Sequence, residues 1–486
     1  MMKVIELSYN HLPHHLKPCF LYFASSPKGS VMMISVLKAH WRAEGLVEQT
    51  EMKSLEEVME VYLDKLISSS LVICFNEMGD VPTCQLHDLV HDFCLIKARE
   101  ENLFDQTSSS ASSSTSSELM PCRLTIKNYY IGPNNSVLSG SKKKHLYSLK
   151  ISGDVTDNRL FDTCHPRYLR LLRVLILESS FIKVKESLLN DICMLNHLRF
   201  LRIRTEKPLW MYNEGSTLLL LPRIWGLRKL QVLSITACSF FDMDEQILIE
   251  EESKLDNLRM LHELKLSYSK DTENIFQRFP NLQVLTFDIM ESREYSTDKY
   301  WFPKLDFLSE LKHLKVGFES SNTNDSGPCL ATNKSWDFHF PLNLEKLVLW
   351  NFPLTSDSLS AIARLPNLEE LALVSPIIQG GEWNMGEEDT FENLKFLNLY
   401  EVTLAKWEVG EESFPVLEKL ELQRCHKLEE IPPSFGDICS LKTIKLVKSP
   451  QLEYSAQKIK EYVEDMGERT SFRSLARIIS SYLSSS

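Results

Sequence analysis

The sequence lacks the features that mark secreted, disulfide-rich and membrane-spanning proteins. Its longest apolar bursts, such as Leu218–Leu221, are far too short to cross a bilayer. Its eleven cysteines are scattered from Cys19 to Cys439 without a Cys-x-x-Cys pair, which favours free thiols in a reducing compartment. The first residues lack the apolar core of a signal peptide. We therefore expect a cytoplasmic protein with no transmembrane segment, and peripheral attachment to membranes remains open.

The sequence also lacks the excess of basic side chains that is typical of nucleic-acid-binding proteins. The chain has 54 lysines and arginines against 66 aspartates and glutamates, a formal charge of -12 that repels phosphate backbones. Residues 1–104 alone hold 9 basic and 14 acidic side chains. Nucleic acid is therefore not an expected partner.

The signatures of phosphate binding and of covalent catalysis are absent as well. None of the 16 glycines precedes a lysine, so the Gly-x-x-x-x-Gly-Lys phosphate loop is missing. No Gly-x-Ser-x-Gly nucleophile elbow occurs. His262-Glu263 begins like a zinc-protease motif, but Leu266 stands where the second histidine would be, so a packed histidine within a repeat is the better interpretation. These absences predict that the chain is not an enzyme.

What the sequence does contain is a repeat with the spacing Leu-x-x-Leu-x-x-Leu-x-Leu. One clear copy is Leu169, Leu172, Leu175 and Leu177. Twelve copies place their third position at residues 149, 175, 201, 233, 264, 285, 314, 347, 371, 397, 420 and 444. These intervals are typical of leucine-rich repeats. An ordinary helical bundle would require the same spacing to arise twelve times by coincidence.

The most complete repeat runs from Phe414 to Gly436. Leu420 and Leu422 alternate inward on a short strand, and Cys425 sits where a small group can bond the turning backbone. One repeat cannot bury this apolar stripe alone, so the repeats must stack. We predict an α/β fold, a leucine-rich-repeat solenoid or horseshoe with a parallel sheet on its concave face, preceded by a small winged-helix-like domain.

The winged-helix prediction comes from the order of elements before the repeats. The first helix is expected over Pro13 to Ala24, the second over Val31 to Glu44, ending at Gly45, and the third from the capping box Ser54-x-x-Glu57. A hairpin of Leu71 to Phe75 with Thr83 to Leu86 and a further helix from about His87 should follow. A serine-rich stretch, Thr107 to Ser117, then marks a boundary. The predicted domains are a winged helix at 1–104, a linker at 105–120, repeats at 121–454, and a capping helix with a tail at 455–486.

Three motifs in the first hundred residues resemble a known family. They are Cys19-Phe20-Leu21-Tyr22-Phe23, the series Ile34, Leu37, Trp41 and Ala43-Glu44-Gly45, and Leu86-His87-Asp88-Leu89-Val90-His91-Asp92. In this order they resemble the end of the nucleotide-binding (NB-ARC) domain of plant disease-resistance proteins, most closely the late-blight type of nightshades. The resemblance extends through the repeats. The turn at Ser25 to Lys28 departs from the acidic turn usual in the family.

The resemblance implies a role for His87 and Asp88. In the family, a Met-His-Asp histidine closes on the phosphate of bound ADP and holds the resting state, and here Leu86 replaces the methionine. Because the phosphate loop is absent, we expect a fragment or truncated product that binds nucleotide weakly or not at all by itself. ADP or ATP would be the cofactor only in the intact receptor.

A zinc site is the alternative interpretation of the same region. Cys84, His87, His91 and Cys94 could supply ligands, with three of them on one helical face. The family resemblance already accounts for His87 and Asp88, and structural zinc sites usually use knuckle loops. We therefore predict no metal.

A row of side chains on the repeats is the predicted partner site. The residues that follow the Leu-x-Leu pairs of neighbouring repeats point to solvent and include Trp350, Val374, Tyr400 and Gln423. Three of the four are apolar or aromatic, a composition that often marks a protein-binding surface. The alternative is isolated surface aromatics with no partner.

Together these observations favour a segment of a plant immune receptor. Its partner would be a protein: a pathogen effector, a guarded host protein or the receptor's own nucleotide-binding domain. A second interpretation is an F-box-like substrate receptor of a ubiquitin ligase, because Leu12-Pro13 precedes the repeats. A generic scaffold is the third.

Overall fold

A computed structural model describes most of the chain. The described residues are 2–108, 122–127, 145–152, 169–178, 186–204, 218–219, 222–239, 254–267, 276–290, 299–300, 302–319, 335–386, 389–410, 412–469 and 477–481. The chain divides into an N-terminal unit, Met1–Glu263, and a C-terminal unit, Leu264–Ser486. Most of the predicted serine-rich linker lies outside the described residues. Each unit is described by itself below.

The N-terminal unit begins with the predicted winged helix. Its helices are α1 (Met2–His11), α2 (Lys17–Leu21), α3 (Ile34–Glu44), α4 (Leu55–Ser68) and α5 (Asp88–Glu100). Short turns η1 (His14–Leu16) and η2 (Tyr22–Ser25) flank α2, so the helix expected over Pro13 to Ala24 is three short pieces. The wing is an antiparallel sheet in the order β1-β3-β2, made of β1 (Met32–Met33), β2 (Ile73–Phe75) and β3 (Thr83–Gln85).

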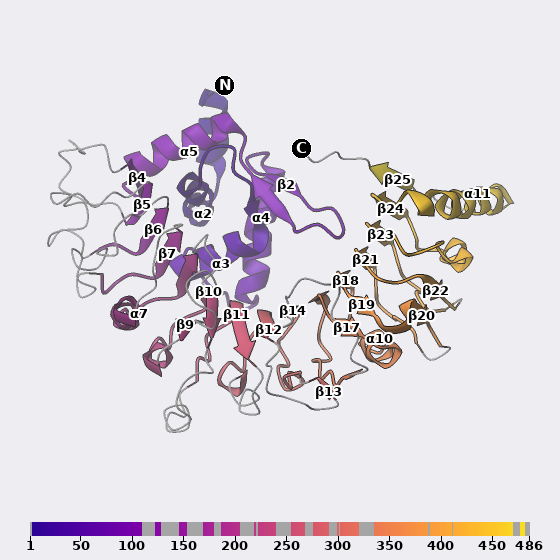
Figure 1. The fold of residues 1–486 in the computed structure, drawn as a ribbon. Coiled ribbons are helices and arrows are strands. Elements are labelled where there is room, and N and C mark those ends of the chain that lie inside the picture. Colours follow the sequence, from indigo (N-terminus) through magenta and orange to yellow (C-terminus); the bar gives the residue numbers. More distant parts are fainter. Residues whose placement is uncertain are drawn as a thin grey trace. The chain divides into compact units, whose positions relative to one another are not determined.

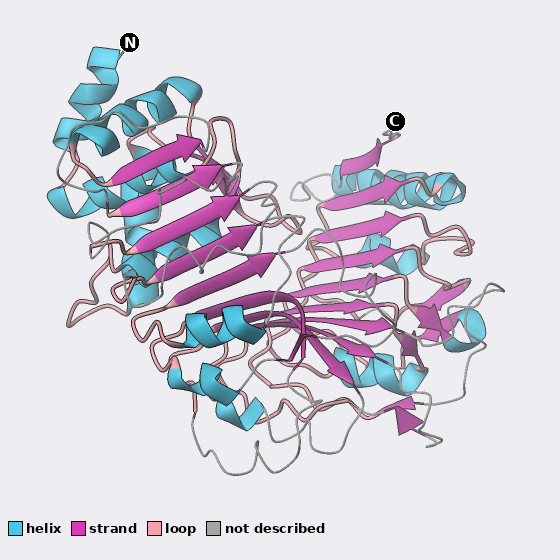
Figure 2. Cartoon of the chain, turned by 60° about the vertical axis from the view of Figure 1, so that its left-hand side comes forward, coloured by secondary structure: helices cyan, strands magenta, loops and turns pink. Residues whose placement is uncertain are grey.

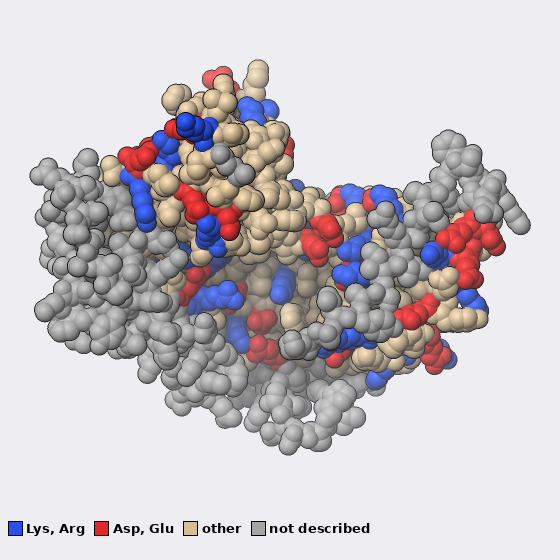
Figure 3. Space-filling model, turned by 90° about the horizontal axis from the view of Figure 1, so that it is seen from above, with Lys and Arg blue, Asp and Glu red and all other residues tan. Residues whose placement is uncertain are grey.

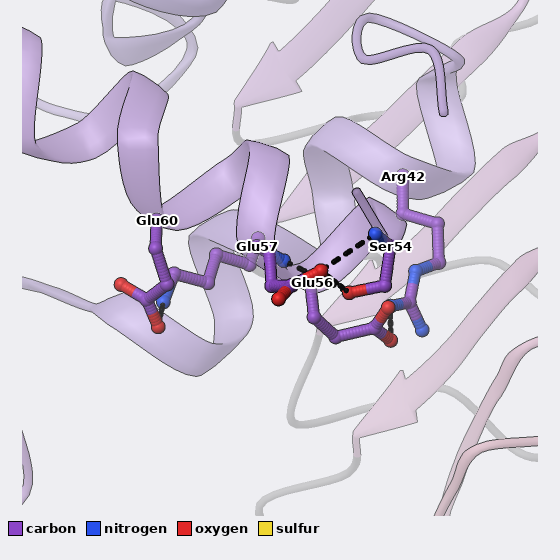
Figure 4. Close-up of polar contacts among 6 residues, drawn as sticks. Arg42, Ser54, Glu56, Glu57 and Glu60 are labelled. Carbon is purple, nitrogen blue, oxygen red and sulfur yellow. Dashed lines mark hydrogen bonds and ion pairs between the residues drawn. The ribbon is translucent and has the colours of Figure 1, made fainter. Parts of the chain in front are cut away.

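Local sequence signals set the ends of these helices. Ser54 and Glu57 cap the start of α4 reciprocally, because the Ser54 hydroxyl accepts from the Glu57 amide and the Glu57 carboxylate accepts from the Ser54 amide (Figure 4). Arg42 of α3 pairs with Glu56 in the same view. Gly45 ends α3 with a φ of 73°, a left-handed conformation that favours glycine. The capping box and this glycine stop are both confirmed.

A ladder of parallel strands follows in the same unit (Figure 1). In order it contains β4 (Phe104–Ser108), β5 (Arg123–Lys127), β6 (Ser148–Ser152), β7 (Val174–Glu178), β8 (Phe200–Arg204) and β10 (Val232–Ser239). The short strand β9 (Leu218–Leu219) pairs with β10 off this path. Between strands lie α7 (Glu186–Cys193) and η6 (Pro222–Gly226). β11 (Met260–Ser267) crosses the division between the units.

The C-terminal unit continues the same construction. Its parallel ladder consists of β12 (Val284–Met290), β14 (His313–Glu319), β16 (Lys346–Trp350), β18 (Glu370–Val374), β21 (Phe396–Tyr400), β23 (Lys419–Gln423), β24 (Thr443–Val447) and β25 (Arg477–Ser481). On the other side of the core lie α10 (Ser356–Ala363), η9 (Pro433–Asp437) and short strand pairs such as β20 (Glu382–Asn384) with β22 (Lys406–Glu408). Helix α11 (Glu453–Arg469) follows the last complete repeat (Figure 2).

The register of the strands confirms the repeat. Leu149, Leu175, Leu201 and Leu233 pair in one line across the N-terminal ladder. In the C-terminal ladder the paired line is Leu285, Leu314, Leu347, Leu371, Leu397, Leu420 and Ile444. All of these side chains are buried. The predicted leucine-rich-repeat solenoid is therefore the fold, with each repeat supplying one strand and one layer of core.

Three elements differ from the sequence-based prediction. Helix α1 was not anticipated, although Ile5 and Tyr9 anchor it in the winged-helix core. Strand β4 pairs with β5 across residues that were assigned to the linker. Strand β25 pairs with β24 in what was expected to be a tail. Neither these three elements nor strand β5 carries the leucine spacing by which the strands of the predicted repeats were recognised.

Candidate functional site

His87 occupies the start of helix α5. Its backbone is extended, with φ -63° and ψ 144°, and its ring nitrogen Nδ1 accepts a hydrogen bond of 3.2 Å from the Leu89 amide. Because Nδ1 is the acceptor, the proton of the neutral ring is on Nε2. His87 and Asp88 are both exposed. The imidazole can therefore present an N–H donor to an anion at a helix N-terminus, where the positive end of the helix dipole lies.

The loop before β1 is held against the same helix. His91 Nε2 lies 2.8 Å from the Ser26 carbonyl oxygen. Lys28 pairs with Asp92 at 2.6 Å, although both side chains are well exposed. These two contacts come from one turn of α5 and hold the loop from Ser26 to Lys28 against that helix.

The four residues considered as zinc ligands have other contacts. The Cys84 Sγ lies 3.6 Å from the Met32 carbonyl oxygen, and the Cys94 Sγ lies 3.9 Å from that of Phe20. His87 caps α5, and His91 binds the loop. Within the described residues, no three His, Cys, Asp or Glu side chains are grouped so that they could hold a metal ion.

Helix α3 packs against the first repeat strands of the N-terminal unit. Ala39 and Ala43 form a small apolar cluster with Val174, Ile176, Phe200 and Val232 from β7, β8 and β10. The His40 ring stacks on Phe200 with 4.3 Å between ring centroids. The small alanine side chains allow the helix to approach the strands closely. The winged helix and the first repeats thus share an interface.

A buried carboxylate lies at the end of this interface. The Glu44 side chain is fully buried, and its Oε2 lies 3.2 Å from Nε of Arg123 on β5. Arg173 also donates from Nη1 to the Glu44 carbonyl oxygen at 2.5 Å. Two arginines from different repeats therefore fix the C-terminal end of α3.

Burial at the interface predicts a pH-dependent stability. Desolvation, together with the positive charges of Arg202 and Lys150, lowers the pKa of His40 from 6.5 to about 3. Below pH 6.5 the unfolded chain binds a proton that the folded chain does not bind, so stability is present above 6.5 and is lost as the pH falls toward 3. We expect this histidine to cost about 1.4 kcal/mol of unfolding free energy per pH unit in that window.

The measurement is urea denaturation at pH 7.5 and at pH 5.5. His40→Gln should show a smaller loss between the two pH values than the wild type. Burial lowers the pKa of His262 to about 4. His262 therefore also lowers the stability at acidic pH, and this second loss persists in His40→Gln. Identical pH dependences of wild type and His40→Gln would contradict the assignment.

The structure brings the predicted partner-binding residues together in the C-terminal unit. Trp350 pairs with Val374, Val374 with Tyr400, and Tyr400 with Gln423 across adjacent strands. Val447 extends the line on β24. We call these five residues the edge row, because each is the last residue of its strand. Trp350 is 43% exposed and the others are half-buried.

The residue after each member of the edge row has the same unusual backbone. Asn351, Ser375, Glu401, Arg424 and Lys448 all have φ between 48° and 60°. The amides of the first four donate to the carbonyl oxygen of the next edge-row residue at 2.7 to 2.9 Å. Cys425 then donates its thiol hydrogen to the Leu399 carbonyl oxygen at 3.2 Å, which confirms the turning position predicted for it. The row is therefore presented by a repeated, hydrogen-bonded turn.

Comparison with known proteins identifies the winged-helix part. Residues 27–94 match the disease resistance protein winged helix domain. Over 97% of its length the chain is 29% identical to a putative late blight resistance protein homolog, R1B-23, of Solanum demissum, of which it covers 38%. It is 31% identical over 91% of its length to late blight resistance protein R1-A of the same species, of which it covers 35%. Over most of its length the chain is therefore similar to proteins named for late-blight resistance.

The chain spans less than two fifths of the length of these similar proteins. Two solved structures also align with it. An internalin of Listeria monocytogenes is 14% identical, with 68% of this chain and 81% of that chain covered and a TM-score of 0.35. A chain of the Toll–Spatzle complex of Drosophila is 14% identical, with 71% of this chain and 43% of that chain covered and a TM-score of 0.43. Leu12, which suggested an F-box, is buried in the winged-helix core. Among the described residues, no helix has both the length and the apolar character needed to cross a bilayer.

Sequence reasoning missed the face of α3 that contacts the repeat strands. It quoted Leu37, Trp41 and Ala43 only as part of the family resemblance and gave no packing role to Ala39, His40 or Ala43. The available signal was a second line of small residues at positions i and i+4 of the same helix. Arg123 could not be recognised, since its repeat lacks the leucine spacing.

Proposed function

We propose that this chain forms the regulatory and recognition part of a plant immune receptor and acts by binding rather than catalysis. Two findings support the proposal. The similar proteins are named for late-blight resistance. A segment that matches the disease-resistance winged helix precedes the leucine-rich repeats in this chain. The observation that carries the proposal is the exposed His87 at the start of α5, whose Nδ1 is occupied by the helix cap. Its remaining N–H is positioned to contact an anion.

In the intact receptor, His87 would contact the phosphate of bound ADP. The chain's own residues fit one phosphate contact, because they supply one N–H donor and a helix N-terminus. They do not form a complete nucleotide site, since the sequence has no phosphate loop. Detection of a partner by the repeats would then loosen the resting state and permit nucleotide exchange. The partner is a pathogen effector, a guarded host protein or the receptor's own nucleotide-binding domain, encountered in the cytoplasm.

Two substitutions separate the cap from the ligand contact. His87→Ala removes both the helix cap and the imidazole N–H donor. His87→Asn removes the imidazole but keeps a side chain that caps helices well. In the isolated chain we expect His87→Ala to lower the free energy of unfolding by about 1 kcal/mol and His87→Asn to leave it nearly unchanged. Urea denaturation of the two variants checks this.

The functional test uses a chimera in which this chain replaces the matching part of a late-blight relative. Both variants should retain less ADP after gel filtration and should cause a hypersensitive response in leaves without a pathogen. Lys97→Ala, at an exposed ion pair on α5, is the matched control and should behave like the wild type. If His87→Asn retains ADP like the wild type, His87 is only a cap and the proposed nucleotide role is wrong.

A further inference from the structure

The charges on the strand face of the C-terminal unit are not distributed evenly. Before and within the strands, lysines are paired with glutamates: Lys312 with Glu345, Lys395 with Glu369, Lys346 with Glu370, Lys442 with Glu418, and both Lys419 and Lys445 with Glu421. Figure 3 likewise shows blue and red side chains interspersed over the described surface in view. Most of the face therefore offers little net charge to a partner.

The cations beside the edge row are the exception. Lys315, Arg424 and Lys448 form no ion pair with any residue that the structure describes. One carboxylate, Glu401, lies among them and is also without a charged partner in the described chain. A second carboxylate, Asp288, lies over Gly317, which pairs with Trp350 on the neighbouring strand. The surroundings of the edge row thus carry an excess of about one positive charge from three cations and two carboxylates.

Two of these cations lie over aromatic rings of the row. The Lys315 ammonium is 5.1 Å from the centre of the Trp350 ring, and the Arg424 guanidinium carbon is 5.7 Å from that of Tyr400. The ring faces hold the cations in place without using their N–H donors. A guanidinium with free donors binds a carboxylate through two parallel hydrogen bonds. The same strip therefore offers an apolar surface and donors for acidic groups.

We propose that the edge row binds an acidic segment of a partner protein, laid across the strands from Trp350 to Val447. With strands about 4.8 Å apart, the row is about 19 Å long, which matches six or so extended residues. Apolar side chains of the segment pack on Trp350, Val374 and Tyr400. Its carboxylates pair with Lys315, Arg424 and Lys448. The inference rests on the proposed function, because it specifies the chemistry of the partner that the repeats recognise.

A protein segment fits this strip better than a nucleic acid. Only three unpaired cations line it, and Glu401 lies among them, so a continuous phosphate backbone would leave many of its charges without a cation and would pass close to a carboxylate. An acidic peptide can place two or three carboxylates at the cations and leave Glu401 uncontacted. A single-stranded oligonucleotide is therefore the competitor that distinguishes the two.

The test is selection of a random twelve-residue peptide library displayed on phage against the full chain. We expect the selected peptides to be enriched in Asp and Glu together with aromatic or aliphatic residues. Synthetic copies should bind about tenfold more weakly to Arg424→Gln and to Lys315→Gln. Glu401→Gln should bind more tightly, a gain that misfolding cannot produce. Lys442→Gln, which removes an ion-paired lysine of the same unit, is the matched control and should leave binding unchanged.

The outcomes separate this inference from the proposed function. Selected peptides that are neutral or basic, or that bind Arg424→Gln as tightly as wild type, overturn the acidic segment. If such peptides still require Trp350 and Tyr400, the edge row remains a recognition surface. Displacement of the peptide by the oligonucleotide at equal concentration would also overturn the inference. The His87 experiment is independent of all these results.

Discussion

Replacing Arg123 with methionine is expected to lower the free energy of unfolding of the N-terminal unit by about 3–5 kcal/mol. The Glu44 side chain is fully buried, the Arg123 side chain is 12% exposed, and their charged atoms lie 3.2 Å apart. Methionine retains much of the volume but leaves the carboxylate buried without a counter-charge. Urea denaturation followed by tryptophan fluorescence measures the loss, because Trp41 is buried in the adjoining core.

The double variant tests whether the unpaired charge is the cause. Arg123→Met with Glu44→Leu removes both charges, and apolar replacement of a buried ion pair is often neutral or stabilising. We therefore expect the double variant to recover most of the loss. Lys97→Met, at an exposed pair, should cost no more than about 1 kcal/mol. A double variant as unstable as Arg123→Met alone would show that packing of the arginine, not its charge, holds α3.

The two arginine contacts also join the winged helix to the first repeats. Glu44 ends α3, and the same helix places Ala43 and His40 on the first repeat strands. Loss of the Arg123 pair should therefore increase amide exchange in α3 and β5 before it increases exchange in α5. A movement of the first repeats would then be transmitted to the winged helix through α3.

The sequence was informative wherever the fold depends on a local, repeated pattern. Eleven of the twelve predicted positions lie in the paired lines of the two ladders, because each repeat must bury the same stripe. The exception is Leu264: the Met260 amide donates to the Gln231 carbonyl oxygen as the Val232 amide does to that of Arg199, which places Leu261 opposite Leu233. The capping box at Ser54 and the stop at Gly45 were predicted because they depend only on neighbouring residues. The edge row was also foreseen, since strand alternation fixes which side chains share a face. Its function as a binding surface stays a prediction.

The sequence was uninformative where contacts join distant segments. The pair of Glu44 with Arg123 joins residues far apart in the chain, and no spacing rule connects them. The strand containing Arg123 was missed because it lacks the leading leucine of the repeat. The excess charge around the edge row was likewise hidden, because a lysine in a sequence does not reveal whether a glutamate faces it from the next strand. The three-dimensional structure is needed to show that Lys442 forms an ion pair with Glu418 whereas Lys315 lies over the Trp350 ring.

A stack of aromatic rings runs through successive repeats of the C-terminal unit. Phe391 and Phe414 lie 5.2 Å apart between ring centroids and are nearly parallel at 8°, and Phe435 follows at 5.8 Å. Trp407 contacts Phe414 at 6.3 Å and Phe435 at 5.0 Å from one side. Phe414 is 1% exposed and Phe435 is fully buried. Phe414 therefore joins three consecutive layers of the core.

Phe414→Ala is expected to lower the free energy of unfolding of the C-terminal unit by about 3–5 kcal/mol, because it leaves a cavity between two rings that cannot close on each other. Phe307→Ala, at a ring that is 40% exposed, should cost far less. Since repeats are stabilised mainly by their neighbours, hydrogen exchange should increase most in β21, β23 and β24 and least in β12. An equal increase of hydrogen exchange in all of these strands would mean that the unit unfolds as one body. Its stability would then not be a sum of contributions from neighbouring layers.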